Sequence, residues 1–168
     1  MANRGAKPRE RSPAAKKAEK SHQTRPAPAS AEATPLRPRI GLEFTLDTVV
    51  PHDWTIQAFD PRLPAVLSTP RMIQLMEHAS TRAIRGELPA GTISVGTRIE
   101  VDHLKAVSDG ASVRTYARLS SYQGRFLIFD VEAKSGDIVI GRGRVFRAIV
   151  ESATHGEKAR ARVSGTEQ

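Results

Sequence analysis

The sequence predicts an α+β domain in which an antiparallel sheet wraps around one long helix. Three observations predict this class: a short strand pattern comes first, a well-marked helix follows, and the side-chain period then changes to two. The order is therefore one strand, one helix and a run of four strands, and no internal repeat is found.

The helix has a clear beginning and a clear end in the sequence. Thr69 is expected as its N-cap and Pro70 as its first helical residue. Gly86, followed by Pro89, is expected to end it. Apolar side chains at helical spacing predict which residues it buries: Met72, Met76, Ala79 and Ala83.

The strands are predicted from alternating apolar side chains. The first covers about residues 42–47, and the stretch after it is expected to be irregular because prolines interrupt it. After the helix in the sequence, the odd-numbered residues from Ile93 to Val101 are expected on one face of a strand. Three more strands follow, over about residues 111–119, 127–133 and 138–150. In the last of them, Gly141 and Gly143 are expected to allow a close backbone approach or a bulge.

Residues 1–39 are set apart by their composition. They hold ten of the 26 Lys and Arg residues, three acidic residues, six of the eleven prolines and no aromatic residue. We expect a disordered basic tail there, a globular domain over residues 40–151, and a shorter loose tail over 152–168. The basic tail is either a solubilising linker or an electrostatic contact for nucleic acid or anionic surfaces, although it lacks an aromatic side chain to stack on bases.

Several classes of chemistry are excluded by what the sequence lacks. Without cysteine there is no disulfide, thiolate nucleophile or cysteine metal site, which fits a cytoplasmic protein. No apolar run is long enough to span a membrane, and no secretory signal core begins the chain. There is also no glycine-rich phosphate loop, no G-x-S-x-G nucleophile motif and no histidine pair with metal-ligand spacing, so we expect no metal.

Two polar side chains occupy positions where the pattern expects apolar ones. Glu77 lies between Ile73 and Ile84 on a stripe at the edge of the buried helix face. His103 continues the odd-numbered strand face after Val101. A carboxylate and an imidazole aimed at the same layer can form an acid–base pair for catalysis. They can also simply satisfy each other or a backbone group, and periodicity alone leaves both interpretations open.

The motifs around these residues are similar to those of a known family. The stretch Ser-Thr-Pro-Arg-Met-Ile-Gln-Leu-Met-Glu at 68–77 resembles the central-helix motif of the fluoroacetyl-CoA thioesterase family. Residues 94–97 and 101–103 continue in that family's manner, and residues 124–131 and 141–150 look like its closing strands. The similarity covers about residues 42–150 and keeps the family's spacings between its motifs.

This resemblance implies a hotdog fold, in which a curved antiparallel sheet cradles a long helix. It also implies a homodimer with the site at the subunit interface. Thr69, Glu77 and His103 fall on the family's catalytic residues. Gly96 falls on a glycine whose backbone contacts the thioester, and Arg147 on an arginine that helps bind substrate. The expected reaction is hydrolysis of an acyl-CoA or acyl-carrier thioester, with no cofactor beyond the CoA of the substrate.

The sequence departs from the family in two places. Val145 stands where the family often has a histidine, so the role of this position is open. The segment 61–66 lacks the phenylalanine gate of the fluoroacetyl-specific enzyme, so we expect a different short or medium acyl chain. The contacts to the CoA phosphates are unassigned among three surface candidates, Arg71, Arg98 and Arg125.

Two further functions compete with hydrolysis. The chain could be a non-catalytic hotdog module that binds an acyl-CoA, which ligands would stabilise without any product being formed. It could also be a nucleic-acid-associated protein that acts through residues 1–39, in which case deleting this tail would abolish a salt-dependent affinity.

Overall fold

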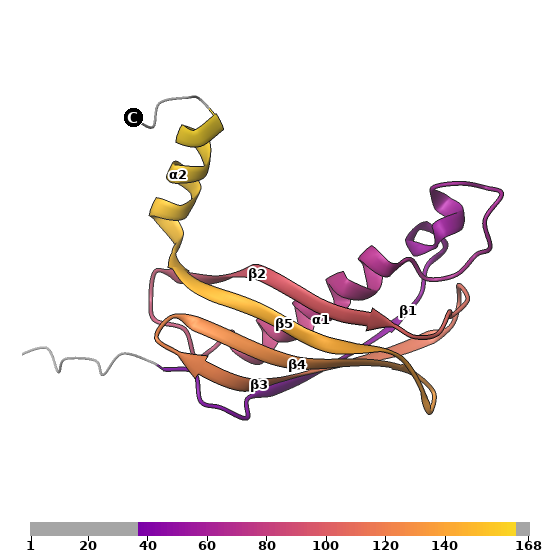
Figure 1. Cartoon of the computed structure of the whole chain (residues 1–168), viewed down its shortest axis with the longest axis horizontal. Coiled ribbons are helices and arrows are strands. Elements are labelled where there is room, and N and C mark those ends of the chain that lie inside the picture. The colour runs from indigo at the N-terminus through magenta and orange to yellow at the C-terminus, as the bar shows by residue number, and fades with distance from the viewer. Residues whose placement is uncertain (1–36, 164–168) are drawn as a thin grey trace, which may run out of the picture. The chain divides into compact units, whose positions relative to one another are not determined.

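A computed structural model describes residues 37–163 of the chain (Figure 1). The predictions for residues 1–36 and 164–168 lie outside the described residues. Five strands and two α-helices are formed, together with two short 3₁₀ turns, η1 (His52–Trp54) and η2 (Ile56–Ala58). The strands are β1 (Glu43–Val49), β2 (Thr92–His103), β3 (Ser112–Gln123), β4 (Phe126–Ser135) and β5 (Ile138–Glu151). The helices are α1 (Thr69–Ala83) and α2 (Ser152–Val163).

The five strands form one sheet in the order β1-β3-β4-β5-β2, and all neighbouring strands are antiparallel. Strands β1 and β2 are therefore its two edges. Helix α1 lies across one face of the sheet (Figure 1). This is the α+β arrangement that the sequence predicts, with the single long helix inserted between the first strand and the other four.

The core lies between α1 and the sheet. The helix buries its predicted apolar residues, Met72, Met76, Ala79 and Ala83, and adds Leu75 to them. Alternate residues of β3 and β4 are buried against the helix, as the period of two in these stretches predicts: Val113, Ala117, Leu119, Leu127, Phe129, Val131 and Ala133. Because each buried Val, Leu, Phe or Met side chain contributes roughly 1.5–3 kcal/mol, the layer holds α1 firmly on the sheet.

A bulge in β2 overturns the prediction that one face runs from Ile93 to Val101. The pairing of β2 with β5 shifts between Gly96 and Arg98, so Thr97 is an extra residue without a partner. An extra residue reverses which side chains point to each face. Before the bulge, Gly96 faces the helix, while after it Val101 packs against the core. The sequence pattern could not reveal this switch because an unbroken alternation of apolar residues runs through it.

The start of α1 also differs from the prediction. Ser68, not Thr69, is the N-cap residue, and Thr69 and Pro70 occupy the first turn. Ser68 makes no side-chain capping bond, and its buried hydroxyl has no hydrogen-bond partner among the described residues. The helix ends at Ala83, slightly before the predicted Gly86. The consequence is that the hydroxyl of Thr69 is not used for capping.

The C-terminal segment is helical where the sequence predicted a loose tail. Helix α2 covers Ser152–Val163, and its side chains are exposed over residues 152–157. The segment is rich in Ala, Glu, Lys and Arg, which favour helix even where little apolar surface is available to bury. No helix in the described part of the chain is long and apolar enough to cross a membrane.

The predicted close approach in β5 is confirmed at Gly143. A Cβ atom added there would collide with the backbone carbonyl oxygen of Glu100 on β2. Because the obstacle is backbone, a larger residue would push β2 away from β5. We expect Gly143→Ala to lower the free energy of unfolding by about 2 kcal/mol or more, measured by denaturant titration.

Gly156→Ala is the matched control, because a Cβ at this position of α2 meets nothing within 4 Å. It should leave stability unchanged or raise it slightly, since alanine favours helix. Equal stability of the two variants would contradict the close approach of β2 and β5.

Candidate active site

A hydroxyl and an imidazole meet where the start of α1 lies beside the end of β2. The Oγ1 atom of Thr69 is 2.8 Å from Nδ1 of His103. Both line a hollow of about 300 Å³ whose other walls are mostly apolar: Ile56, Val66, Leu67, Leu104, Lys105 and Ala106. A nucleophile or water-holding group within hydrogen-bond reach of a base is the usual arrangement for acyl transfer.

The second nitrogen of His103 constrains how this pair works. Nε2 is buried and has no hydrogen-bond partner among the described residues. If the Thr69 hydroxyl donates to Nδ1, the ring proton is on Nε2, because a neutral imidazole carries only one. Nδ1 then faces the hollow as the acceptor, so the imidazole can take a proton from Thr69 or from a water held beside it.

A carboxylate, an arginine and a glycine form a second group further along α1. Oε1 of Glu77 is 3.6 Å from the Nη1 atom of Arg147 on β5. A Cβ atom added to Gly96 would come within 2.5 Å of the same Oε1 atom, so a larger residue there would displace this carboxylate from its place against β2. The bulge at Thr97 turns Gly96 toward the helix, and Gly96 and Arg147 are direct partners across β2 and β5.

Arg147 lies between Ser94, which accepts two of its hydrogen bonds, and Glu77. Its Nε donates to the hydroxyl of Ser94 at 3.1 Å, and its Nη2 donates to the carbonyl of Ser94 at 2.9 Å. Only 6% of the residue is exposed. Burial lowers the pKa of Arg147, and the charge of Glu77 opposes that shift. With its N–H groups directed at Ser94 and Glu77, the arginine orients the carboxylate; its predicted role in substrate binding stays a prediction.

The three predicted catalytic residues do not form one cluster within the chain. Thr69 and Glu77 are eight residues apart on α1, which corresponds to about 12 Å along a helix axis. Thr69 and His103 are joined, but within residues 37–163 no hydrogen bond or ion pair links Glu77 to either of them. The structure therefore presents two half-sites, one with Thr69 and His103 and one with Glu77, Gly96 and Arg147.

Ser94 was not assigned a role from the sequence. It belongs to the Ser-Val-Gly-Thr motif, but its function depends on the bulge at Thr97, which sets its face, and on the buried arginine beside it. A polar residue two positions before Gly96 was the available signal, and it is indistinguishable from any half-exposed serine on a strand.

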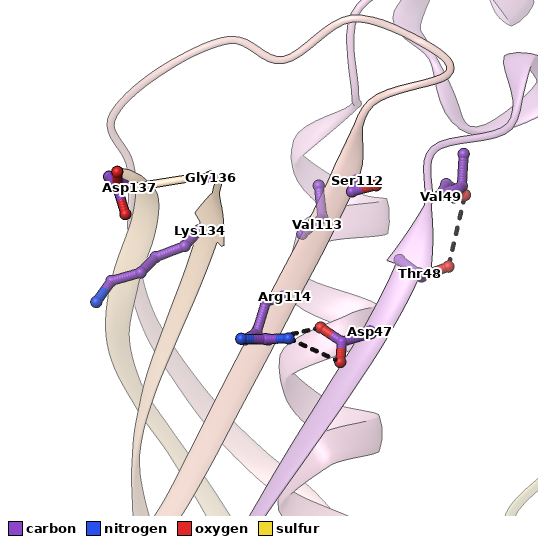
Figure 2. A pocket seen from close by; sticks show the side chains of 9 residues that line it. All are labelled: Asp47, Thr48, Val49, Ser112, Val113, Arg114, Lys134, Gly136 and Asp137. Carbon is purple, nitrogen blue, oxygen red and sulfur yellow. Dashed lines mark hydrogen bonds and ion pairs between the residues drawn. The ribbon is translucent and has the colours of Figure 1, made fainter.

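A different hollow lies at the other edge of the sheet and lacks this chemistry. It has a volume of about 850 Å³ and is lined by residues of β1, β3, the end of β4 and the β4–β5 turn (Figure 2). Two of its charged groups pair with each other, since Nε of Arg114 donates to Asp47 at 2.7 Å. That hydrogen bond lowers the pKa of Asp47, which makes the carboxylate a poor base. Nor do the described residues include a group of three His, Asp or Glu side chains that could hold a metal ion.

The fold and these half-sites define a class of protein. The hot-dog-like protein from Thermanaerovibrio acidaminovorans shares the fold with a TM-score of 0.68 at 20% identity, over 73% of this chain and 91% of that one. The predicted hotdog fold, a curved antiparallel sheet around one long helix, is thereby confirmed.

Closer similarity narrows the class to one family. The model of the fluoroacetyl-CoA-specific thioesterase family matches residues 50–153. The fluoroacetyl-CoA thioesterase of Streptantibioticus cattleyicolor is 38% identical over an alignment of 131 residues that covers 74% of this chain and 91% of that protein. A solved structure of fluoroacetyl-CoA thioesterase has 37% identity and a TM-score of 0.68 over 73% of this chain and 95% of its own. The chain belongs to the fluoroacetyl-CoA-specific thioesterase family, as the motifs predicted.

The contact between Arg147 and Glu77 can be tested through stability. In a double-mutant cycle with Arg147→Met and Glu77→Gln, we expect a coupling energy of about 0.5–2 kcal/mol, because the two groups share one network. Denaturant titration of the four proteins measures it. Pairing Arg147→Met with Glu132→Gln, a surface carboxylate bound to Lys134, is the control. Additive effects in both cycles would show that the arginine does not hold this carboxylate.

Proposed function

We propose that the protein hydrolyses an acyl-CoA, or a related acyl thioester, to the free acid and the thiol. The single observation that carries this proposal is the 2.8 Å contact between the Thr69 hydroxyl and the His103 imidazole in an apolar hollow. Family membership supports it, because the relative that is 38% identical is a fluoroacetyl-CoA thioesterase. Catalytic roles for Thr69, Glu77 and His103 are part of the same proposal.

Each group has a defined task in this reaction. The thioester carbonyl binds beside the backbone N–H of Gly96, whose fixed dipole stabilises the negative charge that develops on the oxygen. Glu77 attacks the carbonyl carbon or activates the water that does so. His103 and Thr69 pass a proton to the leaving sulfur, so that one water is consumed and one acid and one thiol are released. Both routes give the same products.

The reaction needs both half-sites together, and we propose that a homodimer joins them. Strand β2 is a long edge strand, with Ile93 and Ile99 exposed by 41% and 36%. An unpaired, partly apolar edge of this length is a template for pairing with another strand. Pairing with β2 of a second copy would be antiparallel, because a twofold axis relates identical strands in that way.

The bulge supports one particular register for this pairing. Residues on the same face must lie opposite each other across an antiparallel pair. With the axis at Glu100, Arg98 lies opposite the partner's Asp102 and, because Thr97 is extra, Gly96 lies opposite the partner's His103. In this register Glu77, which contacts Gly96, comes to the Thr69 and His103 pair of the partner subunit. Two complete sites result, each shared between the two chains.

We further propose that the acyl group is short and is not selected for fluorine. The hollow beside Thr69 and His103 holds about 300 Å³, at the lower end of the range for small-molecule pockets. Its neighbouring segment, residues 61–66, has no aromatic residue to close over the acyl group. We place the protein in the cytoplasm, with CoA as the carrier.

Removing the acid or the imidazole should abolish turnover without unfolding the protein. For Glu77→Ala and His103→Ala we expect kcat to fall by about 10²–10⁴-fold, because each supplies a proton-transfer or nucleophilic step. Thr69→Ala should lower kcat by a smaller factor, because in this scheme its hydroxyl only relays the proton. Free-thiol release across acyl-CoAs of increasing chain length measures this.

Glu132→Ala and His155→Ala are the matched controls, since both side chains lie on the surface away from the half-sites. Wild-type turnover no greater than that of the Glu77 and His103 variants, over the whole panel, would overturn the proposal. Stabilisation by acyl-CoA without thiol release would indicate a binding module instead.

The interface can be tested with a single introduced thiol, because the chain has no cysteine. A residue on the twofold axis lies beside its own copy, with Cβ atoms about 4.5–5.5 Å apart. We expect Glu100→Cys to form a covalent dimer on mild oxidation, seen on a non-reducing gel. Glu43→Cys on the opposite edge strand should form no covalent dimer and run as a single chain on the same gel. The reverse result would assign the interface to β1.

A further inference from the structure

A cavity at the far end of α1 is not explained by the chemistry above. It has a volume of about 770 Å³ and lies between the last turns of the helix, the loop that follows it, and the first residues of β2. Leu46 of β1 forms part of its wall. The hollow of Thr69 and His103 shares no residue with it.

The charge of this cavity is positive and unbalanced. Arg82 and Arg85 line it, and both are exposed. No described carboxylate lies within ion-pair distance of either arginine; the nearby Glu87 pairs with Arg39 instead. His78 adds a third nitrogen group to the same wall. Two unpaired guanidinium groups beside a cavity favour an anionic ligand, and phosphate matches their donor geometry.

The three arginines that the sequence offered as phosphate contacts are occupied in other ways. Their guanidinium carbons lie 5.2–5.6 Å from aromatic ring centres: Arg71 over Trp54, Arg98 over Phe146 and Arg125 over Phe126. Arg98 also forms an ion pair with Glu100. Their positions do not converge on one cavity, whereas those of Arg82 and Arg85 do.

The remaining walls are mostly apolar and reach the second half-site. Leu46, Leu88, Pro89 and Ile93 provide surface against which an aromatic base or an aliphatic arm can pack. Ser94 lines the cavity and accepts the hydrogen bond from Arg147, the partner of Glu77. Thr81, another lining residue, donates to the backbone carbonyl of Glu77 at 2.9 Å. A thioester held at Glu77 can therefore extend its thiol arm directly into this cavity.

We propose that this cavity binds the phosphate-bearing nucleotide end of coenzyme A, with Arg82 and Arg85 as the phosphate contacts. The inference rests on the proposed thioesterase function, in which the acyl group occupies the hollow beside Thr69 and His103 and the CoA arm runs the other way. Phosphate binding also explains the unbalanced positive charge of the cavity. Arg82 lies in the last turn of α1 and Arg85 lies just beyond it, where a positive charge stabilises the helix dipole, but that effect alone needs no cavity between them.

The direct test is calorimetric titration of CoA, dephospho-CoA and pantetheine into the full-length protein. We expect R82A/R85A to weaken CoA binding about tenfold, because two charge-assisted contacts are lost. Dephospho-CoA separates the 3′-phosphate from the diphosphate, since it retains only the latter. Pantetheine carries no phosphate, so its affinity should be the same for both proteins. Arg118→Ala, an exposed arginine on β3, is the control and should bind CoA as the wild type does.

Kinetics separate this site from the chemistry. For R82A/R85A we expect KM for an acyl-CoA to rise about tenfold at unchanged kcat, while an acyl-N-acetylcysteamine thioester, which lacks phosphate, shows equal kcat/KM with both proteins. Unchanged CoA affinity in R82A/R85A would overturn the inference and assign the arginines to the helix dipole. Equal losses for both thioesters would also overturn it. If the wild type binds CoA through these arginines but releases no thiol, the nucleotide site stands and hydrolysis fails.

Discussion

The constraint on which the site depends is the single extra residue in β2. Without the bulge at Thr97, Gly96 and His103 would fall on opposite faces of the strand, because they are seven positions apart and side chains alternate. With it, both face the helix. Gly96 then leaves room for the carboxylate of Glu77, and His103 reaches the hydroxyl of Thr69. An edge strand can accept such an irregularity, since only one neighbour must adjust its register.

The proposed catalytic groups of one chain therefore lie at two separate places along α1. Two turns of α1, about 12 Å, separate Thr69 from Glu77, and the stretch of β2 from Gly96 to His103 covers roughly 20 Å. Each chain carries both half-sites, and the unpaired edge of β2 runs between them. The buried Arg147 keeps one end in place through Ser94, which explains why a charged side chain occupies the layer between helix and sheet. In the proposed dimer, twofold symmetry places the two ends against each other.

Much of this fold could be predicted from the sequence, for identifiable reasons. The buried faces of α1, β3 and β4 follow regular periods, and Glu77 and His103 stood out as polar residues within apolar patterns. What failed was what periodicity cannot encode. An unmarked bulge placed Gly96 on the face toward the helix, and the helix begins after Ser68, so the hydroxyl of Thr69 lies in the first turn and contacts His103. Residues 152–163 became helical through propensity without an apolar face. Arg82 and Arg85 resembled an ordinary helix end until the cavity between α1 and β2 was visible.

Mixing two inactive variants tests whether each site is shared between two chains. Glu77→Ala and His103→Ala are refolded together in equal amounts, and mass spectrometry confirms that mixed dimers form. A shared site predicts that half the dimers are mixed and that one of their two sites is intact, which restores about a quarter of the wild-type thioesterase activity. If every site lay within one chain, each would carry one substitution. A mixture no more active than the two variants alone would contradict the account.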